Sequence, residues 1–464
     1  MIGALSITTT TILLLVVTGT IRSWALPKNV CRSPVGLQST SKPATVVGTG
    51  TAASCNQAAL VAALLKGGII TFNCGNSGIP VTIPITSELQ VAKGVDTLID
   101  GGGIVTLDGQ GKTRIFRFDR LFYGNATPIF TVQRLRLING YCQDNGGGCA
   151  ILQKNGGTTK IINCTLGGGD TTVISSVFLG NKCSNGGGLG ILGSGLMIYN
   201  SHFEDNQATG KDGNPGLGGN GGAISFDGRG RNNTICGTRF TRNQANKFGG
   251  TFFRVSYNGD EQNNFDNVLI DSNLVVQSGN GAAGALYIQG GTARIRNATI
   301  FNNSATTAGA LFFSNEKAVE LSSVNLIGNR ANTQIGGAFF CSKPVTGTLS
   351  GLTVANNYAG VLGAAFAACT DTLTLSKSII ANNTVGNVYT ANACSNAMND
   401  GKGVIQAPIN KPKPANGVDP PCTNGTGTPM RVDNITVILD TTAWKIKVVG
   451  AQPVYLGPTV VPGL

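Results

Sequence analysis

One phrase of apolar and polar positions recurs along most of this chain. An apolar run ends in Asn, a short polar turn follows, and two small residues then lead into a second apolar run. The Asn positions are 181, 206, 243, 273, 303, 329, 357 and 383. The second runs open with Gly221-Gly-Ala-Ile224, Gly249-Gly-Thr-Phe252, Ala283-Gly-Ala-Leu286, Ala308-Gly-Ala-Leu311, Gly336-Gly-Ala-Phe339 and Gly363-Ala-Ala-Phe366.

Successive Asn positions lie 25, 37, 30, 30, 26, 28 and 26 residues apart. A period of this size built from short strands predicts a solenoid, because no single unit can bury its own apolar face. We expect a right-handed parallel β-helix, since the helix-forming half and Leu spacing of leucine-rich repeats are absent. The recurrent Asn should stack as a hydrogen-bonded amide ladder, a structural role rather than a catalytic one.

Different patterns flank the repeats. Ser54-Cys-Asn-Gln57 has the form of a capping box for a short helix over residues 58–66, ended by Gly67, which would cover the open end of the solenoid. Short strands are expected at 69–72, 81–83, 97–99, 104–107 and 115–118. After about residue 395 the pattern gives way to a Pro-rich stretch and a β-like pair at 435–439 and 444–449. The predicted organisation is therefore a leader at 1–25, a capped β-helix at 26–395 and a tail at 396–464 that packs on or caps the solenoid.

Composition narrows the class. Gly numbers 67 of 464 residues and charged residues are only 12%, which excludes a helix-rich enzyme or a coiled coil. Hydrophobic residues at 41% are enough for a core, so the polar excess does not indicate disorder. The net charge of +12 favours acidic partners such as uronic-acid polysaccharides or anionic cell surfaces. Lys and Arg are scattered rather than clustered, so we expect no nucleic-acid binding.

The N-terminus and the cysteines predict export. An apolar core at Ile12–Val17 and a small-x-small step at Ser23-Trp24-Ala25 are typical of a secretory signal. No other segment is long and apolar enough to suggest a membrane span. All 12 Cys follow Ala25, without a C-x-x-C pair and with only one His, so disulfides are favoured over a metal site and no cofactor is expected.

The repeat phrases resemble those of polymorphic outer-membrane proteins, whose passenger regions look like surface adhesins on a β-helix. Residues 69–75 (Ile-Ile-Thr-Phe-Asn-Cys-Gly) and 99–103 (Ile-Asp-Gly-Gly-Gly), with the predicted helix at Cys55, are similar to secreted pectin-lyase-like proteins. The resemblance covers roughly residues 50–395. It implies the fold more than the function, because this fold carries lyases, hydrolases and adhesins.

The motifs of the enzymes in that class are absent. Polygalacturonase-like hydrolases carry an Asp-Asp pair, Gly-His-Gly and Arg-Ile-Lys, and pectate-lyase-like enzymes carry Trp-Ile-Asp-His; this chain has none of them. Glycoside hydrolysis needs such paired carboxylates. We therefore expect a secreted, non-enzymatic protein that binds polysaccharide or a cell-surface glycan, as an adhesin does.

An atypical polysaccharide lyase is the alternative, with its site in a charge-dense insert at 209–232. A lyase needs a base beside the uronate and cations for the developing negative charge. The candidates are Lys211, Asp212, Asp227, Arg229, Arg231 and Arg254. Asp212 and Asp227 are candidate calcium ligands. A solvated loop with locally paired charges is the competing interpretation, and His202 is expected at the surface.

Strand alternation predicts a second feature. The first residue of each second apolar run should point inward, so the next should point outward. That outer column contains Phe253, Tyr287, Phe312 and Phe340. Exposed, they would form an aromatic stripe suited to sugar rings or a protein partner. The alternatives are that the tail covers these rings or that they belong to the core.

Overall fold

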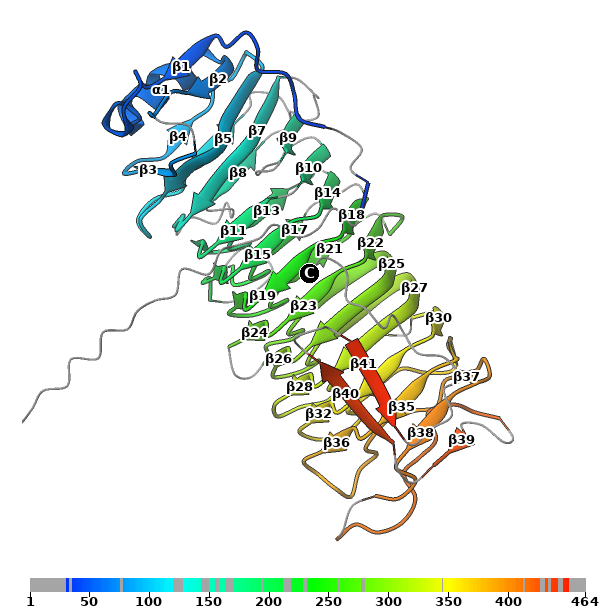
Figure 1. Ribbon diagram of the computed structural model, residues 1–464. Helices are drawn as coiled ribbons and strands as arrows, with labels where there is room; N and C mark the ends of the chain where they lie inside the picture. Colours follow the sequence, from blue (N-terminus) through cyan, green and yellow to red (C-terminus); the bar gives the residue numbers. More distant parts are fainter. Residues whose placement is uncertain are drawn as a thin grey trace, which may run out of the picture.

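The structure is a computed structural model, and it is described for residues 31–32, 36–75, 78–119, 128–142, 150–154, 158–162, 170–174, 176–192, 195–211, 218–227, 232–257, 259–276, 280–343, 345–411, 414–425, 430–432, 435–440 and 445–449. The predicted leader at 1–25 lies outside these residues. The chain winds into an elongated parallel β-solenoid of about 11 turns, which confirms the prediction of an all-β parallel solenoid (Figure 1). In the part described, no helix is long and apolar enough to cross a membrane.

Each complete turn presents up to four strands, and strands of neighbouring turns pair in parallel to form four faces. Within the described residues, faces A, B and C belong to a sheet of 31 strands, and face D is a separate sheet of 8. Face A contains β4 Leu89–Gln90, β6 Phe116–Asp119, β8 Ile151–Lys154, β13 Leu189–Leu192, β17 Ile224–Asp227, β21 Phe252–Val255, β29 Phe339–Cys341 and β33 Phe366–Ala367. Face D contains β12 Lys182–Cys183, β16 Gln207–Ala208, β20 Gln244–Ala245, β24 Leu274–Val275, β26 Ser304–Ala305, β28 Arg330–Ala331, β32 Tyr358–Ala359 and β36 Thr384–Val385.

Face B contains β1 Thr45–Val47, β2 Gly68–Phe72, β9 Thr158–Ile162, β10 Asp170–Ile174, β14 Gly195–Tyr199, β18 Asn233–Cys236, β22 Gln262–Asp266, β30 Gly347–Ser350, β34 Leu373–Ser376 and β37 Asn399–Asp400. Face C contains β3 Val81–Pro84, β11 Val177–Leu179, β15 His202–Glu204, β19 Arg239–Thr241, β23 Leu269–Asp271, β31 Thr353–Ala355, β35 Ile379–Ala381, β38 Ile405–Ala407 and β39 Met430–Arg431. β5 Thr97–Asp108 and β7 Ile129–Ile138 run through faces B and C, and β25 Leu286–Phe301 and β27 Leu311–Ile327 run through A, B and C.

The predicted Asn ladder is confirmed and lies in the corner between faces C and D. The side-chain amide of each Asn from Asn181 to Asn357 donates to the next along the axis at 2.9 to 3.1 Å, and the ladder ends at Asn383. Every member is buried. Each side-chain oxygen from Asn206 onward also accepts the backbone N–H of the preceding Asn. The ladder therefore satisfies backbone groups that a corner would otherwise leave buried and unpaired.

In the repeats, the first two of the small residues that lead into a face A strand are each required for a different physical reason. The first takes a left-handed conformation, as at Ala283 with φ of 64° and Ala308 with φ of 52°. The second has no room for a side chain, because a Cβ on Gly284 would lie 2.2 Å from the carbonyl oxygen of Gly309. A turn this close to the next one therefore requires glycine at the second position in most units.

The N-terminal end is closed by α1 Gln57–Lys66. Leu60, Ala63 and Leu64 are buried in the central core, whereas Leu65 is 71% exposed. The N-cap is Asn56, whose side chain accepts from the Ala59 N–H; Ser54 instead completes a capping box for the preceding 3₁₀ turn, Ala52–Ser54. The cap therefore lies two residues later than the sequence predicts.

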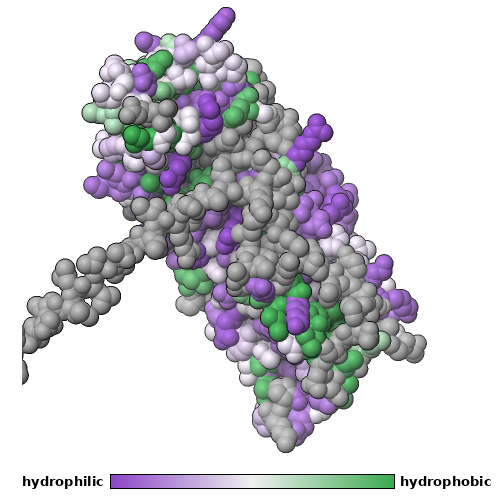
Figure 2. All heavy atoms as spheres, viewed as in Figure 1, coloured by the Kyte–Doolittle hydropathy of each residue, from purple (hydrophilic) through white to green (hydrophobic). Residues whose placement is uncertain are grey.

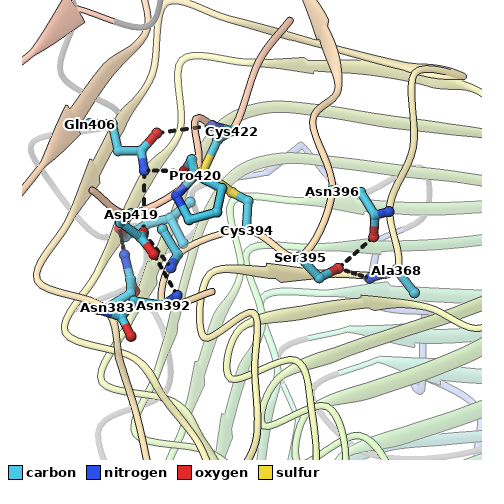
Figure 3. The surroundings of a disulfide bond; sticks show 12 residues. Ala368, Asn383, Asn392, Cys394, Ser395, Asn396, Gln406, Asp419, Pro420 and Cys422 are labelled. Atoms are coloured by element: carbon cyan, nitrogen blue, oxygen red, sulfur yellow. Dashed lines mark hydrogen bonds between the residues drawn. A yellow bond between two sulfur atoms is a disulfide. The ribbon is translucent and has the colours of Figure 1, made fainter. Parts of the chain in front are cut away.

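Five disulfides join described residues: Cys31–Cys236, Cys55–Cys74, Cys142–Cys183, Cys341–Cys369 and Cys394–Cys422. At the C-terminal end of the solenoid, the Cys394–Cys422 disulfide lies near the side chain of Asp419 (Figure 3). The carboxylate of Asp419 accepts the backbone N–H groups of Asn392 and Ala393 at 2.7 and 3.0 Å. A side-chain carboxylate therefore pairs the two backbone N–H groups that a strand of the next turn would otherwise pair.

The segment before β1 forms an N-terminal strap, residues 31–32 and 36–44, over the outer side of face B (Figure 1). The Cys31–Cys236 bond fixes one end. The side-chain amide of Asn200 exchanges two hydrogen bonds with the backbone of Cys31, and that of Gln133 does the same with Gln38. The strap is therefore held on the solenoid at several points along its length.

Near the C-terminus, β40 Thr436–Asp440 and β41 Lys445–Val449 form an antiparallel hairpin. It packs on the outer side of face C, where Val437, Ile446 and Leu439 contact apolar side chains that include Ile327, Phe301 and Leu269. Figure 1 shows the hairpin over the strands of the C-terminal half, and Figure 2 shows apolar side chains gathered there. Much of face C is consequently covered by the chain itself.

Candidate functional site

The structure describes the charged insert only in part. Lys211 is exposed and Asp227 is half-buried, while Asp212, Arg229 and Arg231 lie outside the described residues. The described residues contain no group of three His, Cys, Asp or Glu side chains that could hold a metal ion.

Arg254 is not the surface cation that a lyase site would need. It follows the inward-facing Phe252 by two residues and therefore points into the solenoid, where it is fully buried. Its guanidinium lies 3.8 Å from the centre of the Phe226 ring, and Nη2 lies 3.7 Å from Oε1 of buried Glu261. Burial lowers the pKa of Arg254 to about 10. A polymer outside the solenoid cannot reach this group.

His202 is also buried, contrary to the expected surface position. It is 7% exposed on the outer side of face C, with Nε2 3.3 Å from Oε2 of Glu204. Burial, with Arg239 and Arg242 nearby, lowers the pKa of His202 to about 3, and burial raises the pKa of Glu204. Arg242 pairs with both Glu204 and Asp205. Because Glu204 is only 2% exposed, this cluster resembles a buried ion-pair network more than an open catalytic site.

The predicted aromatic column exists, but it is not an exposed stripe. Successive ring centres lie 5.2 Å apart for Phe253 and Tyr287, 4.5 Å for Tyr287 and Phe312, and 5.3 Å for Phe312 and Phe340. Phe253 is 1% and Phe312 is 9% exposed, and the other two are half-buried. Tyr287, Phe312 and Phe340 belong to a cluster separate from the central core, together with Phe248, Ala282, Ala283 and Ala308.

Stacking explains the low exposure of these rings. The rings of Tyr287 and Phe312 are stacked and nearly parallel, with 9° between their planes, so each covers a face of the other. Burial raises the pKa of Tyr287 to about 12. A sugar needs an open ring face for stacking, and this column offers mainly ring edges.

Face B presents a different surface, which sequence reasoning missed. From β22 to β34 its outward positions are polar and either half-buried or exposed, and they stand in register from turn to turn. We call these positions the polar wall: Asn264, Arg294, Glu320, Thr348 and Thr374 in one line, and Asp266, Arg296, Ser322, Ser350 and Ser376 in the other. The signal in the sequence was the strict alternation of these residues with buried ones such as Phe265, Ile295, Leu321, Leu349 and Leu375.

Some side chains of the polar wall form hydrogen bonds with neighbouring side chains. Arg294 donates to both carboxylate oxygens of Glu320, at 2.8 and 3.2 Å, and to Gln262 at 2.7 Å. Asp266 accepts from Asn297 at 2.9 Å. These bonds fix long side chains flat against the sheet.

Other polar groups of the wall have no partner within the described part of the chain. The exposed guanidinium of Arg296 has no hydrogen-bond or ion-pair partner among the described residues, and the same holds for the five hydroxyls at positions 322, 348, 350, 374 and 376. Strands of adjacent turns are about 4.8 Å apart, so the hydroxyls repeat at that interval along the axis. The wall therefore offers a regular array of donors and acceptors beside a free cation.

The chain matches no protein-family model, and neither a curated relative nor a similar solved structure was found.

Proposed function

We propose that this protein is an extracellular solenoid that binds a polysaccharide or a cell-surface glycan along the polar wall, without chemically changing it. The observation that carries the proposal is the register of unpaired hydroxyls beside the free guanidinium of Arg296. An extended polymer lying along the solenoid axis would meet an equivalent polar group at each turn. Hydroxyls suit sugar hydroxyls, and Arg pairs well with carboxylate or sulfate groups.

Charge favours an acidic polymer. The net charge is +12, so the protein attracts polyanions over a distance, and Arg296 would supply a local contact. The disulfides are compatible with an oxidising, extracellular location. The lyase alternative is less well supported, because its candidate cation Arg254 points into the solenoid.

Isothermal titration with pectin, alginate and glycosaminoglycans tests the proposal. We compare Arg296→Glu on face B with Arg330→Glu on face D, since both arginines are exposed and both substitutions change the net charge equally. Affinity should fall at least about tenfold more for Arg296→Glu, because a charge-assisted contact is worth about 1.5–3 kcal/mol. Equal losses in both variants would show attraction by net charge alone. Unsaturated uronate products, detected by their ultraviolet absorbance, would contradict binding without turnover.

A further inference from the structure

A cavity of about 280 Å³ lies at the other end of face B, under the N-terminal strap. Its floor is formed by outward side chains of three consecutive turns, where Ile69 pairs with Leu98 and Leu98 with Thr131. The strap supplies Gln38 and Ser39, and Asp96 lines the cavity from the corner before β5. The cavity is thus built from segments far apart in the sequence.

The lining combines two kinds of surface. Ile69, Leu98 and Ile129 give apolar contact, while hydroxyl, amide and carboxylate groups line the same space. The hydroxyl of Thr131 and the side-chain amide of Gln38 have no hydrogen-bond partner within the described residues. The half-buried side chain of Gln38 and the exposed carboxylate of Asp96, beside an apolar floor, suit a ligand that has one apolar side and several hydroxyls.

The carboxylate of Asp96 and the backbone of the strap are held in place before any ligand arrives. Oδ1 of Asp96 accepts the backbone N–H of Ile129 at 2.6 Å. The strap is fixed at Gln38, whose backbone N–H and carbonyl pair with the side-chain amide of Gln133 at 2.9 and 3.0 Å. A pre-formed cavity loses little conformational freedom on binding, which favours affinity for a small ligand.

We propose that this cavity binds a single neutral pyranose ring. Its volume is at the lower end for ligand sites, which favours one sugar unit over a longer segment. The C–H side of the ring would lie on Ile69 and Leu98, and its hydroxyls would reach Asp96 and Gln38. Asp96 is the one ionisable side chain in the lining, so a uronate would be repelled. The site is separate from the polar wall and differs from it in preferring an uncharged ligand.

Binding is measured by titration of the full chain with methyl glycosides of glucose, galactose and mannose, and with the methyl glycosides of glucuronic and galacturonic acid. At least one neutral glycoside should bind with about millimolar affinity, as expected for so few atoms. Uronates should bind about tenfold more weakly, and Asp96→Asn should bring the two classes close to equal affinity while keeping the acceptor for Ile129.

A matched pair of strap variants tests the location. Ser39→Trp fills the cavity from an exposed position and should abolish binding, whereas Leu37→Trp, also exposed but not in the lining, should leave it unchanged. Arg296→Glu should have no effect, which separates this site from the polar wall. Absence of saturable binding by every neutral glycoside, equal binding of uronates, or unchanged binding in Ser39→Trp would overturn the proposal. Binding of apolar peptides in place of sugars would also overturn it.

Discussion

The Asn ladder allows a prediction of stability from individual hydrogen bonds, with Asn273→Ala as the perturbation. Oδ1 of Asn273 accepts from the backbone N–H of Asn243 at 2.8 Å and from its Nδ2 at 2.9 Å. Nδ2 of Asn273 donates to Oδ1 of Asn303 at 2.9 Å and to two carbonyls, those of Phe240 and Asp271, at 3.2 and 3.0 Å. All of these bonds are buried.

Alanine would leave the backbone N–H of Asn243 buried without a partner, which costs about 1–3 kcal/mol. Nδ2 of Asn273 has two hydrogens for its three acceptors, so it makes about two full hydrogen bonds. With the bond from Nδ2 of Asn243, three further bonds are lost at about 1 kcal/mol each, and the total loss before any relaxation should be about 4–6 kcal/mol. Asn332→Ala is the control, because Asn332 is exposed and, within the described residues, its side chain bonds only to Ser304 and Arg330. It should cost less than about 1 kcal/mol.

Urea unfolding followed by far-ultraviolet circular dichroism measures both variants. Because a solenoid can unfold turn by turn, hydrogen exchange at the Asn243 amide provides a local readout. In Asn273→Ala that amide should exchange much faster than in the wild type, and in Asn332→Ala it should be unchanged. A loss of stability in Asn273→Ala within about 1 kcal/mol of the control would refute the structural role of the ladder.

Three further predictions concern the turn, the buried His and the strap. Gly284→Ala should destabilise by several kcal/mol in urea unfolding, because its Cβ would lie 2.2 Å from a carbonyl oxygen, whereas Ala283→Gly should stay within about 1 kcal/mol of wild type. Because the folded pKa of His202 is lowered to about 3, stability falls as pH falls below about 6.5; between pH 6.5 and 5 the wild type should lose about 2 kcal/mol more than His202→Gln. Equal pH slopes would contradict this. Replacing Cys31 and Cys236 by Ala should cost about 2–4 kcal/mol and speed proteolysis within the strap, while unchanged cleavage would mean that Asn200 and Gln133 alone hold it.

Periodicity predicted much of the fold because identical residues occupy the same structural position in every turn. The Asn ladder follows from one amide repeated at the same corner, and its members were correctly identified. The glycine that precedes the face A strand in most repeats was also found, but its cause, a neighbouring carbonyl within 2.2 Å at Gly284, requires three-dimensional packing.

The candidate sites were harder to predict, since their chemistry depends on what covers each side chain. Strand alternation that places Phe252 inward also places Arg254 inward, although a charged residue is usually expected outside. The same alternation predicted the column that contains Phe253 and Tyr287, but it did not predict the ring stacking that lowers the exposure of the rings. The polar wall was overlooked because Ser and Thr carry no sequence motif, and only the register between turns brings them into one surface.

The dependence of affinity on ligand length tests the central claim most directly. The polar wall spans five turns, so its four intervals cover about 19 Å at about 4.8 Å each. With size-fractionated oligosaccharides of the acidic polymer that binds best, affinity should rise with each added unit until the oligomer spans the wall, and then level off. A monosaccharide that binds as tightly as the polymer, or an affinity independent of length, would contradict recognition along the polar wall.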